Sequence, residues 1–372
     1  MAGPVALLGT YETKPEELAA LSAAFQEHGL AVVRVDLSLG AGGQVLPGDE
    51  KLRRMGEAVD RTVGEISAAN PSAVVAVGGG TGSEMALRAM RQLPLDLPRF
   101  MITTLPFDPR GAVADSAITL VPTLCDVQGM NAILRRVFQR TAAMVAGVVG
   151  SDTPAPAPRR SVAVTMLGVT QGAGEEILRL LRTQGHETSA FHASGFGGAA
   201  LTRFAQAGMF SGLIDMTVNE AVRLHVAGAH VPMPARFTCA SALPRVLLPG
   251  AMNFLDGGAL DQLRPEWRER PHYRQSSYFT HVKLTEPEMV RVATALAADL
   301  NTSTAPCEVL LPMGGFSSED RPGGAIEDAA LRECAAAVFE AEARSYSVTR
   351  IPSHISAPET AAEAVSRLLS HI

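Results

Sequence analysis

The stretch whose residue types best suit ligand chemistry is Gly78–Ser83, a run of glycines and hydroxyls. It follows the apolar run Val74–Val77, which predicts a buried strand, and precedes Glu84–Met90, which predicts a helix. Glycines let a ligand approach the backbone, and a helix start offers unpaired N–H groups and the positive end of a dipole. The alternative is a tight turn without a ligand, because the run has neither a Walker A ending nor a clean G-x-G-x-x-G spacing. The residues that we expect to contact phosphate are Gly79, Gly80, Thr81, Gly82 and Ser83.

Polar residues also follow the other expected strands of the first half. The strand Val5–Leu8 leads into Gly9–Lys14, and the strand Ala31–Val35 ends in Asp36. An acidic residue at that place commonly binds a ribose hydroxyl, but Asp36 suits a helix N-cap or a solvated loop equally well. Hydroxyls, a lysine and carboxylates at strand ends suit a nucleotide triphosphate with Mg²⁺. The further nucleotide candidates are Gly9, Thr10, Glu12, Thr13, Lys14, Asp36 and Thr103.

The second half of the chain has residue types that suit acid–base chemistry instead. The candidates are His192, Glu220 and His354. His192 ends an expected strand and precedes a second glycine-rich turn, Ala193–Gly198, but such a histidine is more often a plain core or loop residue. Glu220 is equally explained by the first turn of a helix, where a carboxylate interacts favourably with the dipole.

Strands and helices alternate along the whole chain, which predicts α/β folding with mainly parallel, doubly wound sheets. Prolines at alternate positions in Ser151–Arg160 cannot continue a helix and predict a semi-rigid linker. We therefore expect two Rossmann-like domains, 1–150 and 161–372, joined by the linker 151–160, with a cleft between their strand ends. Ligands of open α/β sheets bind beyond the carboxyl ends of the strands, so the candidate residues belong to that edge.

Composition sets limits on the partners. The chain has 372 residues, enough for two domains, and its net charge of −6 argues against a broad nucleic-acid interface. The four cysteines form no C-x-x-C pair, so neither a zinc knuckle nor a disulfide framework is indicated. The sequence shows no basic leader and no apolar run of membrane-spanning length. We expect a cytoplasmic protein without a membrane or nucleic-acid partner.

Several motifs together resemble one protein family. Gly9–Lys14 resembles a G-T-x-D-T-K motif, and Pro122–Asn131 is similar to P-S-V-V-D-I-x-G-L-N. Beside the glycine turn Gly78–Ser83, further similar segments are Met166–Thr170, Phe191–Gly198, Asp215–Thr217, Pro249–Ala251, Leu311–Ser317 and Pro322–Gly324. On these motifs the chain is identified as a member of the Tm-1-like ATP-binding family, UPF0261, over nearly its whole length.

The resemblance implies two Rossmann-like subdomains, ATP bound mainly by the first, and dimerisation. Carried over by position, the nucleotide residues are Gly9, Thr10, Thr13, Lys14 and Gly79–Ser83. This chain departs from the family at Glu12, where an aspartate is usual, and at Leu105–Arg110, which replaces a small-residue loop containing Ser-Gly. The expected helix Asn131–Val149 is apolar around much of its circumference, so it must be buried in a core or against a partner, and the resemblance favours a homodimer.

Two functions from different classes follow. The first is an ATP-binding protein whose ligand lies at the strand ends of the first domain, facing the cleft. The second is an enzyme that acts on a small carboxylate or carbonyl metabolite by acid–base catalysis, with His192, Glu220 or His354 on the second-domain side.

Overall fold

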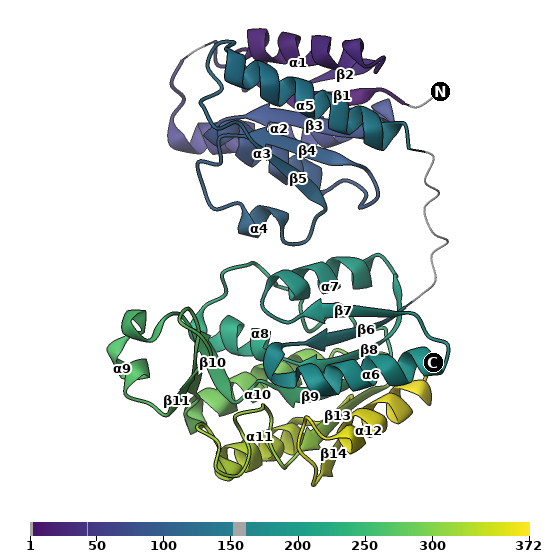
Figure 1. The fold of residues 1–372 in the computed structure, drawn as a ribbon, viewed down its shortest axis with the longest axis vertical. Helices are drawn as coiled ribbons and strands as arrows, with labels where there is room; N and C mark the ends of the chain where they lie inside the picture. The colour runs from purple at the N-terminus through teal and green to yellow at the C-terminus, as the bar shows by residue number, and fades with distance from the viewer. Residues whose placement is uncertain (1–2, 43, 152–160) are drawn as a thin grey trace. The chain divides into compact units, whose positions relative to one another are not determined.

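The computed structural model describes residues 3–42, 44–151 and 161–372, which divide into two compact units, Met1–Pro156 (unit 1) and Ala157–Ile372 (unit 2) (Figure 1). Each unit has its own parallel sheet. The expected α/β class with two Rossmann-like sheets is therefore confirmed. The expected linker 151–160 lies outside the described residues, except for Ser151.

Unit 1 has five parallel strands in the order β2-β1-β3-β4-β5. The strands are β1 (Val5–Gly9), β2 (Val32–Asp36), β3 (Ala73–Gly78), β4 (Arg99–Thr103) and β5 (Ile118–Pro122). The helices are α1 (Pro15–Glu27), α2 (Gly48–Ala69), α3 (Gly80–Arg91), α4 (Arg110–Val113) and α5 (Ala132–Val149). Because side chains alternate along a strand, Val75 and Val77 pack with α1 and α5, whereas Val74 and Ala76 pack with α2 and α3.

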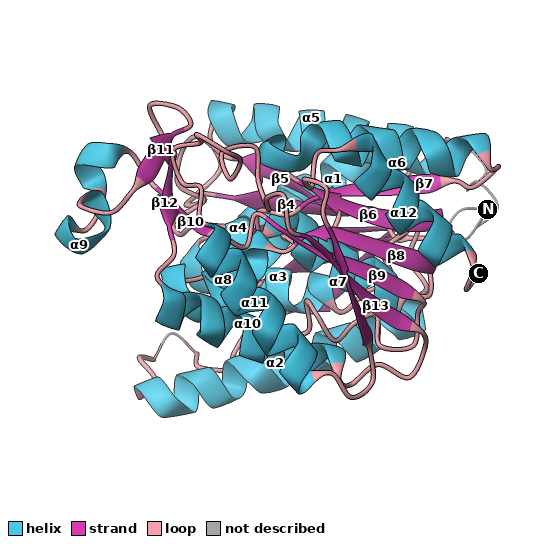
Figure 2. Ribbon diagram, turned by 90° about the horizontal axis from the view of Figure 1, so that it is seen from below, coloured by secondary structure: helices cyan, strands magenta, loops and turns pink. Residues whose placement is uncertain are grey.

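Unit 2 repeats this plan with six strands in the order β14-β13-β9-β8-β6-β7, several of which lie side by side in Figure 2. The strands are β6 (Ser161–Met166), β7 (Thr188–His192), β8 (Phe210–Thr217), β9 (Arg245–Gly250), β13 (Cys307–Pro312) and β14 (Ser347–Ile351). The helical segments are η1 (Gly168–Thr170), α6 (Gln171–Thr183), α7 (Phe196–Gln206), α8 (Asn219–Val222), η2 (Arg223–Ala227), α10 (Glu286–Leu300), α11 (Ala329–Glu342) and α12 (Pro358–Leu369). Helices α6 and α12 pack on one face of the sheet, and α10 and α11 contribute to the core on the other face.

A small antiparallel sheet projects from unit 2 between β9 and α10. Its strands, in the order β10-β12-β11, are β10 (Phe254–Gly257), β12 (Thr280–Lys283) and β11 (His272–Arg274). The connection from β10 to β11 contains η3 (Leu260–Gln262) and α9 (Pro265–Arg268). Trp267 in α9 packs partly against the largest core of unit 2, and the Arg264 guanidinium lies 4.7 Å from its ring centre.

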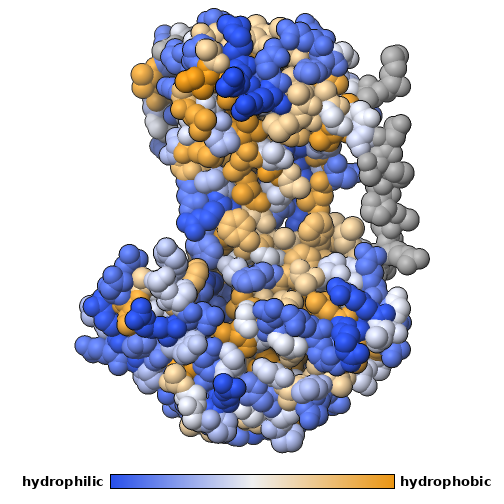
Figure 3. Space-filling model, viewed as in Figure 1, coloured by the Kyte–Doolittle hydropathy of each residue, from blue (hydrophilic) through white to orange (hydrophobic). Residues whose placement is uncertain are grey.

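Helix α5 buries one face rather than its whole circumference. Leu134, Phe138 and Val145 are buried against the sheet, whereas Ile133 and Met144 are 51% and 43% exposed. Figure 3 shows apolar residues among polar ones on the face of unit 1 that carries α1 and α5. No helix in the described parts of the chain is long and apolar enough to cross a membrane.

Candidate functional site

The glycine turn of unit 1 joins the end of β3 to the start of α3. A Cβ on Gly78 would lie 2.6 Å from the Ser83 amide nitrogen, so only glycine fits this close approach. Gly79 has open space where a Cβ would stand. The Ser83 amide donates to the Gly79 carbonyl. Gly80, Thr81 and Gly82 form the first helical turn, whose N–H groups have no carbonyl acceptor within the helix.

Two neighbouring loops flank this turn. A Cβ on Gly82 would lie 4.0 Å from Thr10 Cγ2, and one on Gly80 would lie 3.8 Å from Pro106 Cγ. The structure therefore brings Thr10 and the Leu105–Arg110 loop next to the turn. Leu105 has a positive φ of 50°, which is uncommon for a residue with a side chain and marks a sharp exit from β4.

The hydroxyls of Ser83 and Thr103 point into the protein rather than toward the open turn. Both residues are buried, their oxygens lie 2.7 Å apart, and Ser83 also donates to the Gly78 carbonyl. The Leu105 amide donates to Thr103 as well. These two candidates fix the turn on β4, so a ligand would meet the backbone of Gly79–Gly82 instead.

The other candidates of unit 1 tie its exit loops together. Asp36 accepts from the amides of Tyr11 and Ser38 and pairs with Arg34 at 2.8 Å. Partial burial opposes ionisation, but the hydrogen bonds from Ser38 and Arg34 lower the pKa of Asp36 overall. Glu12 accepts from the Gly42 amide.

Gly9, Thr10, Thr13 and Lys14 form the exit of β1. Gly9 ends the strand, and the hydroxyls of Thr10 and Thr13 lie 2.6 Å apart. Lys14 Nζ donates to the Val127 carbonyl and to Gln128 Oε1. The structure thus brings Lys14 to the loop after β5, and no contact between Lys14 and Gly79–Ser83 is described.

In unit 2, Glu220 belongs to a fully buried ion network. Arg236 pairs with Asp215 at 2.7 Å and with Glu220 at 2.5 Å, and all three side chains are 0% exposed. The other Glu220 oxygen accepts from the amides of Gly195 and Gly198. Burial alone would raise the pKa of Asp215, but the charge and hydrogen bonds of Arg236 lower it. The sequence pattern does not single out Arg236, which lies outside every strand and helix.

The two histidine candidates differ in their surroundings. His354 Nε2 lies 2.9 Å from the Ser317 carbonyl, and its Nδ1 accepts from the Ser356 amide, so both ring nitrogens are engaged in holding loops. His192 is exposed at the end of β7 and bonds Ser194 Oγ through Nδ1. No hydrogen bond or ion pair among the described residues joins His192, Glu220 and His354 to one another. Among the described residues, no group of three or more His, Cys, Asp or Glu is arranged to hold a metal ion.

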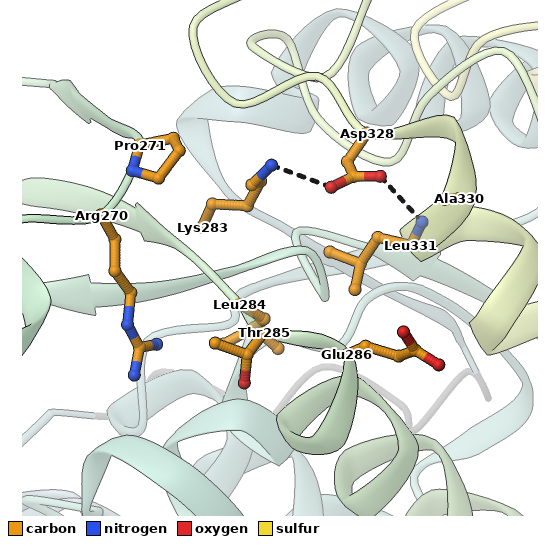
Figure 4. Close-up of a pocket in the computed structure, with 9 residues that line it drawn as sticks. All are labelled: Arg270, Pro271, Lys283, Leu284, Thr285, Glu286, Asp328, Ala330 and Leu331. Atoms are coloured by element: carbon orange, nitrogen blue, oxygen red, sulfur yellow. Dashed lines mark hydrogen bonds and ion pairs between the residues drawn. The ribbon is translucent and has the colours of Figure 1, made fainter.

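A pocket of about 270 Å³ lies between the starts of α10 and α11. Figure 4 shows the Lys283 ammonium pointing to Asp328, 2.8 Å away, while the other Asp328 oxygen accepts from the Leu331 amide. Arg270 pairs with Glu288 at 2.7 Å. Both cations and the start of α11 thus already have carboxylate partners from the chain itself. This arrangement stabilises the joint between the small sheet and the two helices.

Fold and candidate sites define a two-unit α/β protein whose candidate residues lie mainly at the carboxyl edges of parallel sheets. The chain belongs to UPF0261: residues 44–154 match the N-terminal domain and residues 159–372 the C-terminal domain of that uncharacterised protein family. The family expected from the sequence motifs is therefore confirmed.

Relatives cover both units. A UPF0261 protein of Mesorhizobium japonicum is 31% identical over 95% of this chain and 96% of its own length. One of Rhizobium meliloti is 29% identical over 97% of each. The ToMV resistance protein Tm-1(GCR237) of Solanum lycopersicum is 27% identical over 71% of this chain but only 36% of its own length.

The ion network makes Arg236 a strong determinant of stability. We expect Arg236→Ala to lower the free energy of unfolding by about 3–5 kcal/mol, because two carboxylates are left buried without their cation. Urea unfolding followed by circular dichroism measures this change. Arg179→Ala, which removes an exposed arginine from α6 of the same unit, is the matched control and should change little. Equal unfolding midpoints for Arg236→Ala and wild type would contradict the assignment.

Asp328 should make a pH-dependent contribution to the free energy of unfolding. Burial opposes its ionisation, but Lys283 and the Leu331 amide lower its pKa in the folded state. Its charge therefore stabilises the fold above the unfolded pKa, and this contribution is lost as the pH falls through the folded value. We expect Asp328→Ala to cost about 1–2 kcal/mol at neutral pH, since a helix cap is also lost.

Urea titrations at neutral and acidic pH test this expectation. The difference between Asp328→Ala and wild type should narrow in acid. Asp328→Asn keeps a capping oxygen, so at neutral pH it should lower the free energy of unfolding less than Asp328→Ala does. Asp261→Ala, which removes an exposed carboxylate, is the control. A difference that widens as the pH falls would show that the sign is wrong.

Proposed function

We propose that unit 1 binds ATP, with the phosphates at the start of α3. The observation that carries this proposal is the open turn Gly79–Gly82 at the start of the helix, where three of the four residues, Gly79, Gly80 and Gly82, have no side chain to cover the first-turn amides. Backbone N–H groups and the helix dipole favour a phosphate there without a Walker lysine. The adenosine part rests on the resemblance to the Tm-1-like ATP-binding family.

The sheet topology supports the same location. In the order β2-β1-β3-β4-β5, the chain reverses its direction across the sheet between β1 and β3. Ligands of open α/β sheets bind at such a switch point, beyond the carboxyl ends of the strands. The exits of these two strands are Gly9–Lys14 and Gly78–Ser83, and Thr10 lies beside Gly82.

The glycine-rich turn between β7 and α7 of unit 2 is a useful contrast. There Glu220 accepts from the amides of Gly195 and Gly198, so a carboxylate of the chain already occupies the anion position. In unit 1, no atom of the described residues other than its chain neighbours lies within 4 Å of the place where a Cβ on Gly79 would stand. This difference favours unit 1 for an external anion.

We expect Lys14 and Mg²⁺ to contact the phosphates as well. Lys14 would exchange the Val127 carbonyl for a phosphate oxygen, which its flexible stem allows. Mg²⁺ would enter with the phosphates, because it is commonly held by one or two carboxylates and the nucleotide.

Acid–base chemistry on a small carboxylate or carbonyl compound remains a prediction with His192 as its exposed candidate. A cytoplasmic location also remains a prediction.

ATP titration by calorimetry, with and without Mg²⁺, tests the site. Gly80→Val should abolish binding by covering the amides, and it should fold, because Gly80 has no positive φ and its nearest neighbour, Pro106, is at contact distance. Lys14→Ala should weaken binding about tenfold to a hundredfold, the loss of one charged hydrogen bond.

Gly64→Val in α2 is the matched control, since a Cβ there meets nothing within 4 Å. It should bind ATP as wild type does, and circular dichroism should confirm that all variants are folded. The site assignment is wrong if folded wild type binds no adenine nucleotide at millimolar concentration, or if Gly80→Val binds normally.

We further propose that α5 forms a homodimer contact. Ile133, Met144 and Val148 share one helix face by their spacing and are each more than 40% exposed. Met144→Glu should shift the protein toward monomer in sedimentation velocity at micromolar concentration. Val45→Glu, at an apolar position of the same unit that is 98% exposed, is the control. A wild type that sediments as a monomer would refute the proposal.

A further inference from the structure

The two sides of the glycine turn in unit 1 differ in what a nucleotide would meet there. In the sheet order β2-β1-β3-β4-β5, β1 and β2 lie on one side of β3, and β4 and β5 lie on the other. Phosphates at the start of α3 therefore leave two directions for the nucleoside along the carboxyl edge of the sheet. Because neighbouring strands are about 4.8 Å apart, the ends of β2 and β5 each lie about 10 Å from the end of β3.

On the β2 side, the groups that suit a nucleoside already have partners in the chain. The Arg34 guanidinium lies 3.9 Å from the ring centre of Tyr11 and covers one face of that ring. Tyr11 also packs partly against the core beneath α1 and α5. Asp36, the ribose candidate, accepts from two amides and pairs with Arg34. A nucleoside on this side would have to compete with contacts that hold the loops.

On the β5 side, apolar side chains are exposed instead. Phe107, in the loop after β4, is 36% exposed, and Leu124, in the loop after β5, is 87% exposed. Thr103 and Pro122 are paired at the ends of the two strands, and the Thr123 amide continues the ladder by donating to the Thr103 carbonyl. The two loops therefore leave the sheet side by side.

Both loops begin with the same uncommon backbone conformation. Leu105 and Leu124 each lie two residues beyond the pair of Thr103 and Pro122, and their φ angles are 50° and 61°. Residues with a side chain rarely adopt this left-handed region, and those that do are concentrated at active sites and ligand clamps. The two strained turns lie at the edge of the sheet where ATP is proposed to bind.

The loop that carries Phe107 is restrained and lies next to the glycine turn. Pro106 and Pro109 fix φ close to Phe107 on both sides. A Cβ on Gly80 would lie 3.8 Å from Pro106 Cγ, so the loop starts within contact distance of the turn. A binding surface that is already ordered loses little conformational entropy when a ligand binds.

We propose that the base of the bound nucleotide stacks on the Phe107 ring and packs against Leu124, on the β5 side of the glycine turn. This inference rests on the proposed binding of ATP in unit 1. An aromatic ring and an aliphatic side chain give the flat base apolar contacts. The β2 side, where nucleotide folds commonly hold the ribose, keeps its own contacts between Tyr11, Arg34 and Asp36.

Calorimetry on the full chain with two probes, ATP and inorganic tripolyphosphate, tests this inference. Tripolyphosphate has the phosphates without a base. Phe107→Ala should weaken ATP binding about fivefold to a hundredfold, the loss of one base–aromatic stack, and should leave tripolyphosphate binding unchanged. Phe107→Tyr keeps a ring and should bind ATP as wild type does. Val290→Ala, which shortens a side chain of similar exposure in α10 of unit 2, is the control and should change neither affinity.

Photolabelling with 8-azido-ATP reports the direction of the nucleoside independently of affinity. After digestion with trypsin, the label should lie on peptides 100–110 or 111–135, which contain Phe107 and Leu124. Label mainly on peptide 35–51, which contains Asp36, would place the base on the β2 side and overturn the inference.

The calorimetric results separate this inference from the ATP proposal. The inference is wrong if Phe107→Ala, shown to be folded by circular dichroism, binds ATP as tightly as wild type. It is also wrong if the substitution weakens ATP and tripolyphosphate equally, since the loop would then serve only the phosphates. Both results leave ATP binding in unit 1 standing. If wild type binds neither probe at millimolar concentration, the ATP proposal is wrong and this inference is wrong with it.

Discussion

In unit 2, one guanidinium buried out of contact with water connects the central sheet to its exit loops. Arg236 reaches Asp215 at the end of β8 and Glu220 in α8 at once, and Glu220 in turn holds the amides of Gly195 and Gly198. A buried charge that loses its partner is far more costly than an exposed one. The end of β8 and the turn after β7 are therefore fixed jointly, by a network rather than by apolar packing alone.

In unit 1, uncharged groups rather than an ion network fix the glycine turn to the sheet. The hydroxyl pair of Ser83 and Thr103 fastens its glycine turn to β4, and the approach of Gly78 to the Ser83 amide sets the sharpness of that turn. Because no carboxylate fills the unit 1 turn, its first helical amides stay available. Two turns of similar sequence character thus differ in what they can do: one is a closed structural joint, and the other is open to an anion.

The sequence predicts the strands and their order of appearance well, because continuous apolar runs such as Val74–Val77 indicate buried parallel strands. It does not predict the direction of side chains at the strand ends. The partner of Ser83 is Thr103 on a neighbouring strand, and the partner of Glu220 is Arg236 in a loop. The strand β12 is not predicted, because it spans only Thr280–Lys283, too short for a clear alternating pattern. Such features depend on tertiary contacts that a linear pattern does not contain.

The position of Trp267 has a consequence for spectroscopy. It is the single tryptophan of the chain, and it sits in α9 beside the small sheet of unit 2, with the Arg264 guanidinium over its ring. Indole emission from this protein therefore originates at one known place. It is a built-in optical reporter for the surroundings of the small sheet, and unit 1 contains no tryptophan. Unfolding of the small sheet can therefore be followed without a label, and a signal from the whole backbone can be recorded on the same sample.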